Sequence, residues 1–144
     1  MTYCVAIRVN QGLVMLSDTR TNAGMDNIGR FRKSFTYHVP GERAMAIMCS
    51  GNLSITQEVK QTLTRQIKDA ETQPENETLL NCATMHRAAQ IIGEAMGIVQ
   101  KRYRSSIEMQ GASADASILF AGQRRGGKPR LYMIYAQGNF IEAT

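Results

Sequence analysis

The sequence predicts an α+β fold in which helices pack outside layered antiparallel sheets. Segments rich in β-forming residues stand at both ends of the 144-residue chain, and two segments with helical periodicity lie between them. Short turns join neighbouring strand segments, as they do in antiparallel hairpins. The length suits a single domain with a core of its own.

Four strands are expected in the first third of the chain, at residues 2–9, 13–16, 34–39 and 43–49. Asn10-Gln11-Gly12 separates the first two apolar runs and is typical of a turn, so these runs predict a hairpin that begins directly after Met1. Pro40-Gly41-Glu42 separates the second two runs in the same way. A polar loop over residues 18–29 is expected between the two pairs.

Two helices are expected next. Ser50-Gly51-Asn52 interrupts the fourth strand and supplies helix-capping residues. Apolar residues then recur at every fourth position, which predicts one buried helical face; they are Ile55, Val59, Leu63 and Ile67. After a loop over residues 69–76, apolar residues spaced by threes and fours predict a second helix over residues 78–104.

After a loop over residues 105–114, three final strands are expected at residues 117–121, 131–136 and 140–141. Two helices are too few to cover both outer faces of two stacked sheets, and the last strand reaches almost to Thr144. We therefore expect residues 1–144 to form a single domain that is incomplete at its C-terminus.

The composition argues against several classes of protein. Apolar residues make up 43% and charged residues 20%, which disfavours disorder. No apolar run approaches the ~20 residues that span a bilayer, and the N-terminus is unlike a signal peptide. The three cysteines form no C-x-x-C pair and His38 and His86 are isolated, so we expect no metal, no cofactor and a reducing cytoplasmic compartment.

The net charge of +5 raises the question of a nucleic-acid partner. Basic residues fall into separate clusters without interleaved aromatic residues, and residues 69–77 are acidic, so no such partner is expected. Binding through the basic turn around Arg124 and Lys128 stays open as an alternative. The string GQRRGGKP over residues 122–129 nearly matches a phosphate-binding loop, but a proline replaces the metal-binding hydroxyl and a strand follows.

The position of Thr2 points to a specific chemistry. An initiator methionine is normally removed when a small residue follows it, and removal of Met1 would leave Thr2 with both a hydroxyl and a free α-amine. Such an amine has a pKa of about 7.7 to 8.0, so near neutral pH it can take the hydroxyl proton and activate the oxygen as a nucleophile. A terminus held in a sheet would keep this geometry fixed.

Three further residues could complete such a site. Asp18 stands where the second strand ends, one hairpin from Thr2, and could orient a lysine or the amine. Lys33 opens the third strand, where its ammonium could lower the pKa of the hydroxyl and stabilise negative charge. Gly51 lies between a strand and a helix, so its N–H could donate to an oxyanion. Separately, each has an ordinary explanation as a turn, surface or capping residue.

Taken together, these segments resemble a known family. Thr2 at the start, SDTRTNAG from residue 17, FRK from residue 31, CSGNL from residue 49 and the ending YAQGNFIEAT are similar to proteasome-type β subunits, and in particular to the bacterial Anbu family of proteasome homologues. The resemblance extends through the whole chain. It implies the four-layer αββα sandwich of the N-terminal nucleophile hydrolases, with part of the second sheet and the second helical layer missing here.

The resemblance also implies a function. The protein would be a threonine-type hydrolase that cleaves peptide or other amide bonds after Met1 is removed, with Thr2 as nucleophile, Asp18 and Lys33 as its charged partners and the Gly51 N–H as oxyanion donor. Self-association into a ring or stacked ring is expected, with peptide or protein as substrate. The alternative is a catalytically silent subunit that only builds such an assembly.

Substrate-binding residues are implied in the same way. The backbone of the substrate would add as a strand along Asn22, Gly51 and Leu53. Thr21, Phe31 and Cys49 would line the first specificity pocket, which would then be mixed and partly apolar.

Overall fold

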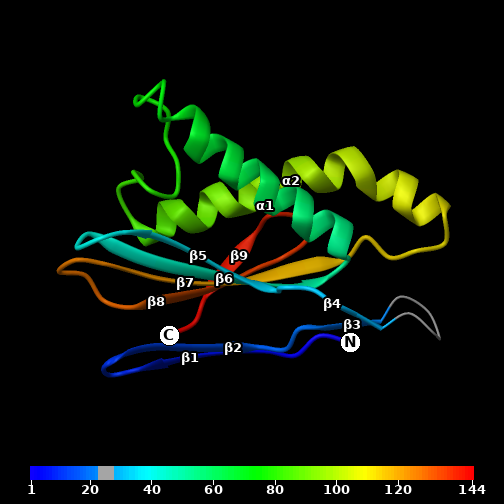
Figure 1. The fold of residues 1–144 in the computed structure, drawn as a ribbon, viewed down its shortest axis with the longest axis horizontal. Helices are drawn as coiled ribbons and strands as arrows, with labels where there is room; N and C mark the ends of the chain where they lie inside the picture. Colours follow the sequence, from blue (N-terminus) through cyan, green and yellow to red (C-terminus); the bar gives the residue numbers. More distant parts are fainter. Residues whose placement is uncertain (23–27) are drawn as a thin grey trace.

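The computed structural model describes residues 1–22 and 28–144, which form a mixed fold of helices and antiparallel sheets (Figure 1). The strands are β1 (Cys4–Val9), β2 (Gly12–Ser17), β3 (Arg20–Asn22), β4 (Ile28–Arg30), β5 (Ser34–Val39), β6 (Arg43–Gly51), β7 (Ala116–Arg124), β8 (Arg130–Ile134) and β9 (Phe140–Glu142), and the helices are α1 (Leu53–Asp69) and α2 (Met85–Met109). Neither helix is long and apolar enough to cross a membrane.

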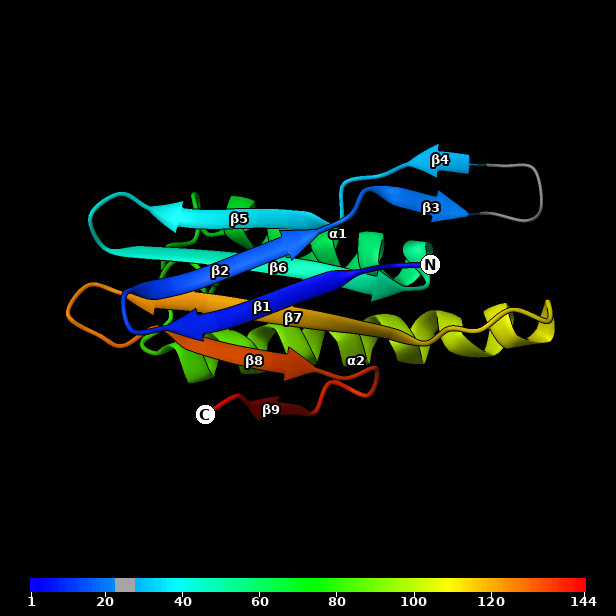
Figure 2. The ribbon, with the colours of Figure 1, turned by 90° about the horizontal axis from the view of Figure 1, so that it is seen from below.

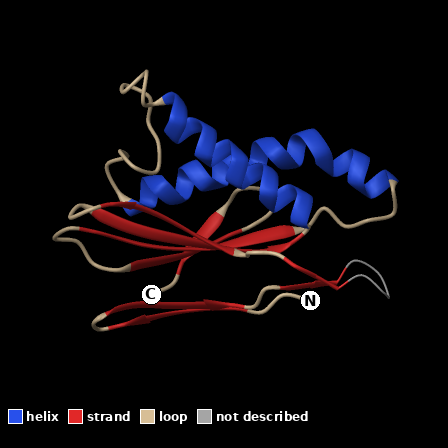
Figure 3. Ribbon diagram, viewed as in Figure 1, coloured by secondary structure: helices blue, strands red, loops and turns tan. Residues whose placement is uncertain are grey.

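A five-stranded antiparallel sheet in the order β5-β6-β7-β8-β9 is the centre of the fold. Both helices pack on one face of this sheet, and the β1–β2 hairpin lies across the other face (Figures 1 and 3). Because both faces of the central strands are covered, Ile47, Met48 and Cys49 are buried in succession instead of alternating with exposed residues.

The core lies between the helices and the sheet. Ile55, Val59 and Leu63 of α1 are fully buried, as their spacing predicts. On the sheet, the stacked rings of Phe120 and Tyr132 have centroids 5.8 Å apart. The two helices contact each other on one outer face of the sheet, which agrees with the predicted packing of helices outside the sheets.

The β1–β2 hairpin confirms the first predicted turn, although β1 begins at Cys4 and not at Thr2. The hairpin crosses β6, β7 and β8 (Figure 2). Its outward face is apolar, with Tyr3, Ile7, Val14 and Leu16 exposed. Because β1 begins at Cys4, Thr2 precedes the sheet, and the residue after it, Tyr3, exchanges two hydrogen bonds with Asp18: the Tyr3 amide donates to the Asp18 carboxylate, and the Asp18 amide donates to the Tyr3 carbonyl.

The loop expected over residues 18–29 is partly wrong, because β3 and β4 pair within it as a short antiparallel ribbon. The remaining part of that loop, residues 23–27, which includes two residues of the SDTRTNAG string, lies outside the described residues.

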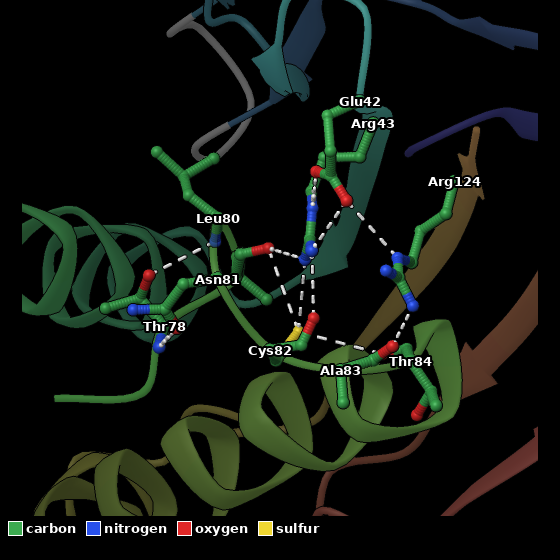
Figure 4. Close-up of polar contacts among 10 residues, drawn as sticks. Glu42, Arg43, Thr78, Leu80, Asn81, Cys82, Ala83, Thr84 and Arg124 are labelled. Atoms are coloured by element: carbon green, nitrogen blue, oxygen red, sulfur yellow. Dashed lines mark hydrogen bonds and ion pairs between the residues drawn. The ribbon is translucent and has the colours of Figure 1, made fainter. Parts of the chain in front are cut away.

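The expected bounds of the second helix are also wrong, since α2 begins at Met85 and extends to Met109. The Asn81 side chain accepts from the Thr78 amide and donates to the Asn76 carbonyl, which folds residues 78–82 into a turn. The buried guanidinium of Arg43 donates hydrogen bonds to two backbone carbonyls of this turn (Figure 4). With those carbonyls bound elsewhere, the helix begins only at its cap, Thr84, which accepts from the Arg87 amide.

Candidate functional site

A cavity of about 110 Å³ lies where the start of the chain meets the start of β5 and the junction between β6 and α1. It is lined by Met1, Thr2, Thr21, Arg32, Lys33, Phe35, Cys49, Ser50, Gly51, Leu53, Thr56 and Gln57. Six of the residues predicted for the site are among these, although they come from four separate segments of the chain. Asp18 stands behind the cavity, in contact with Lys33.

Lys33 is the charged centre of this site. Only 6% of its surface is exposed, and its ammonium donates to Asp18 Oδ1 at 2.8 Å, to the Arg20 carbonyl at 2.6 Å and to the Met1 carbonyl at 3.4 Å. A buried ammonium is costly unless it is paired and hydrogen-bonded, and these three partners satisfy its three donors. The ammonium is therefore held in one position at the wall of the cavity.

Asp18 is fixed as firmly as Lys33. Its carboxylate accepts from the Tyr3 amide at 2.9 Å and from the Arg20 amide at 3.1 Å, besides the bond from Lys33. The hydrogen bond from Lys33, followed by that from Tyr3, lowers the pKa of the Asp18 carboxyl from 3.8 to about 2. The Asp18 carboxylate is therefore ionised at neutral pH, and Asp18 couples Lys33 to the residue that follows Thr2.

Thr2 lines the same cavity and is half-buried. The Met1 carbonyl that contacts Lys33 belongs to the peptide bond with Thr2, so covalent geometry keeps the Thr2 nitrogen within about 6 Å of the ammonium. In this chain that nitrogen is an amide. It becomes a basic amine only when the bond between Met1 and Thr2 is cleaved.

Gly51 forms the opposite wall at the end of β6, where it pairs with Ala116. Its φ is +94°, and a Cβ added there would lie 2.3 Å from the Asp115 carbonyl oxygen, so both the backbone conformation and the packing require glycine. Asn52 next to it caps α1 by accepting from the Ser54 and Ile55 amides. The backbone at Gly51 is thus anchored by a sheet on one side and a helix on the other.

The rest of the cavity wall is mixed. Cys49 and Leu53 contribute apolar surface, and burial raises the pKa of the Cys49 thiol to about 12, so this thiol is neutral. Thr21 supplies a hydroxyl. Among the described residues, no group of three or more His, Cys, Asp or Glu side chains is placed to hold a metal ion.

Two of the predicted residues lie elsewhere. Phe31 does not line the cavity; its ring is 41% exposed and covers Gly29 of β4. Asn22 lies at the end of β3, where its backbone pairs with Ile28. Phe35 lines the cavity in the place expected for Phe31, because Phe35 lies within β5 whereas Phe31 precedes that strand.

The predicted strand over residues 34–39 is the signal by which the sequence could have shown Phe35, since it includes Phe35 and leaves Phe31 out. Arg32, Ser50, Thr56 and Gln57 also line the cavity without having been predicted. Thr56 and Gln57 belong to the first turn and a half of α1, and the same argument from position next to Gly51 could have found them.

Comparison with known proteins gives a consistent picture. No protein-family model and no curated protein matches the chain. Among solved structures, the chain is similar to Anbu (ancestral beta-subunit) from Yersinia bercovieri, with 40% identity and a TM-score of 0.85, and to Anbu from Hyphomicrobium sp. strain MC1, with 39% and 0.82. The helical assembly of the Anbu complex from Pseudomonas aeruginosa gives 39% and 0.86.

In all three comparisons the whole of this chain is covered, but it spans only 56% to 57% of the length of the solved chain.

Proposed function

Since the chain belongs to the Anbu family of proteasome β-subunit homologues, we propose that it carries the nucleophile half of a threonine-type N-terminal nucleophile hydrolase. The observation that supports this most is the gathering of Thr2, Lys33 and Gly51 around one small cavity, with Asp18 bonded to Lys33. The reaction is the cleavage of peptide or other amide bonds after Met1 is removed.

The proposed steps use only groups at this cavity. The neutral α-amine of Thr2 takes the hydroxyl proton, and the oxygen attacks the carbonyl carbon of the substrate. The Gly51 N–H and the Lys33 ammonium stabilise the negative charge that develops. The tetrahedral intermediate collapses as the C–N bond breaks, the leaving amine takes the proton, and water then hydrolyses the ester on Thr2.

We further propose that the complete protein has the four layers of the N-terminal nucleophile hydrolases, with residues 1–144 as one incomplete domain of it. The solved relatives are longer, and the apolar residues Ile7, Val14 and Leu16 on the outside of the β1–β2 hairpin are surface that further layers would cover. The described residues supply one of the two helical layers.

Self-association is part of the same proposal, because one solved relative forms a helical assembly. A ring or stacked ring remains the expected form, and a silent structural subunit remains the second candidate, supported by the same relative. Cys4, Cys49 and Cys82 are free thiols, which supports a reducing compartment such as the cytoplasm.

Covalent labelling tests the proposed chemistry directly. The chain is incubated with an activated peptidyl ester, and intact mass and peptide mapping locate the acyl group. We expect a hydroxylamine-sensitive adduct on Thr2 in molecules that lack Met1, none in Thr2→Ala, and retention in Thr2→Ser, which keeps the hydroxyl. Lys33→Met should slow labelling roughly 10²-fold to 10³-fold, the usual cost of removing one group that stabilises an oxyanion.

Equal labelling of the parent protein and Thr2→Ala would contradict the proposal and favour the structural subunit. Adducts that survive hydroxylamine and map to surface lysines would also contradict the proposal, because they would not be esters of Thr2.

A further inference from the structure

A second hollow adjoins the cavity that contains Thr2. It has a volume of about 510 Å³ and is lined by Arg32, Ser34, Phe35, Thr36, Tyr37, Lys60 and Thr64. Arg32 and Phe35 line both hollows, so the two lie next to each other along β5 and α1, and we treat them together as one groove. The groove therefore leads away from the position where Thr2 would react.

The charge of this groove is entirely positive in the described part of the chain. Arg32, Lys33 and Lys60 line it, whereas no Asp or Glu does so. Lys33 is neutralised by Asp18, but neither Arg32 nor Lys60 forms an ion pair with a described acidic residue. Two cations next to a partly enclosed groove produce a field that an anionic group would complement.

Lys60 is held in position by an aromatic contact. Its ammonium lies 4.2 Å from the centroid of the Phe35 ring, which forms the boundary between the two hollows. Burial, and then the neighbouring Cys4, raise the pKa of the Cys49 thiol, while the Lys60 ammonium opposes that rise.

We infer that this groove selects substrates with an acidic side chain, Asp or Glu, on the acyl side of the bond that is cut. Such a side chain would extend from the cavity past Phe35, and its carboxylate would lie between Arg32 and Lys60. Leu53 and Cys49 would contact its methylene groups. The inference rests on the proposed function for the position of the scissile bond, but recognition by Arg32 and Lys60 does not require Thr2 to react.

Peptide binding therefore tests the inference separately from catalysis. Fluorescence anisotropy measures the affinity of two labelled, C-terminally amidated peptides that differ only by Glu or Gln at the selected position, with the parent chain and with Thr2→Ala. We expect the Glu peptide to bind roughly threefold to tenfold more tightly in both proteins, the range for partly exposed charge contacts, and the ratio to fall as salt is raised.

The variants Arg32→Gln and Lys60→Gln should each lower the Glu-to-Gln ratio, and together they should bring it close to one. Lys68→Gln is the matched control, because Lys68 lies on the same helix, is exposed and lines neither hollow, so the ratio should be unchanged. A ratio near one in the parent chain, no measurable binding of either peptide, or a ratio insensitive to Arg32→Gln and Lys60→Gln would overturn the inference.

A third peptide, with Leu at the selected position and a free C-terminal carboxylate, separates side-chain recognition from recognition of a chain end. Binding of this peptide as tight as that of the Glu peptide would overturn the inference. In contrast, a failure of labelling at Thr2 with an intact Glu preference would refute the proposed hydrolase and leave the binding site standing.

Discussion

Replacing Arg43 by methionine should destabilise the protein strongly, although Arg43 lies far from the cavity. Its side chain is only 4% exposed, and it donates to the Leu79 and Cys82 carbonyls, each at 2.9 Å, while its other donors bind Glu42 and the Cys82 sulfur (Figure 4). Methionine fills a similar volume but cannot donate. Two buried carbonyls would lose their donors, at about 1–3 kcal/mol each.

Improved packing of the apolar side chain offsets part of that cost, so we expect a net loss of about 2–5 kcal/mol. For a chain of this size such a loss lowers the melting temperature by roughly 5–15 °C. Urea unfolding followed by far-UV circular dichroism measures the change in free energy. Arg43→Lys, which keeps the charge and some of the donors, should fall between the parent and Arg43→Met.

Arg124 provides the matched control, because it is the cross-strand partner of Arg43, binds the same Glu42 and donates to the Ala83 carbonyl. Its side chain is 41% exposed, so water can replace those contacts in Arg124→Met, and the loss should stay below about 1 kcal/mol. Equal losses in the two variants, or a loss below about 1 kcal/mol in Arg43→Met, would refute the assignment of stability to burial of the Arg43 contacts.

Two further predictions concern the site itself. Gly51→Ala should lower the free energy of unfolding in urea by about 2–4 kcal/mol and slow labelling of Thr2, because the new Cβ would meet the Asp115 carbonyl at a positive φ. The control is Gly41→Ala, where φ is also positive but the Cβ would lie in open space, and this variant should lose only about 1 kcal/mol. Equal losses in the two variants would contradict the packing argument. Because the pKa of Asp18 is lowered from 3.8 to about 2 in the folded state, its contribution to stability should be complete above about pH 4 and lost as the pH falls towards 2. The urea midpoint of the parent chain should therefore drop more in that pH window than the midpoint of Asp18→Asn. Parallel curves for the two proteins would show that the ion pair with Lys33 does not stabilise the fold.

The strands of the central sheet could be predicted well from the sequence, since their turns carry strong local signals. Residues 34–39 are predicted and observed as the same strand, on either side of which Lys33 and Pro40 mark the boundaries. The second helix could not be bounded in this way. The apolar spacing continues through Leu79 and Cys82, which are indeed buried, but their carbonyls bind Arg43 from a strand that is distant in the sequence. Periodicity reports burial and not the hydrogen-bond partners of the backbone.

In the candidate site, too, some features could be predicted from the sequence and others could not. The contact between Asp18 and Lys33 and the position of Gly51 were expected from their places at the ends of elements, where side chains and amides from several strands can meet. Phe31 and Phe35 are four residues apart, so the alternation of faces along a strand does not distinguish them. They differ because β5 begins at Ser34, so Phe35 lies within the strand and Phe31 precedes it.

The geometry at Thr2 depends on how the β1–β2 hairpin docks on the sheet, because Thr2 leads directly into this hairpin. Thr2 precedes the first strand, and it is connected to the ion pair by the bonds between Tyr3 and Asp18 and by the bond from Lys33 to the Met1 carbonyl. The hairpin itself packs on the sheet with one face, while its other face exposes Ile7, Val14 and Leu16. Any layer that covers this outer face would hold the hairpin against the sheet. Coverage of this outer face and alignment of the proposed nucleophile are therefore coupled through the same two strands.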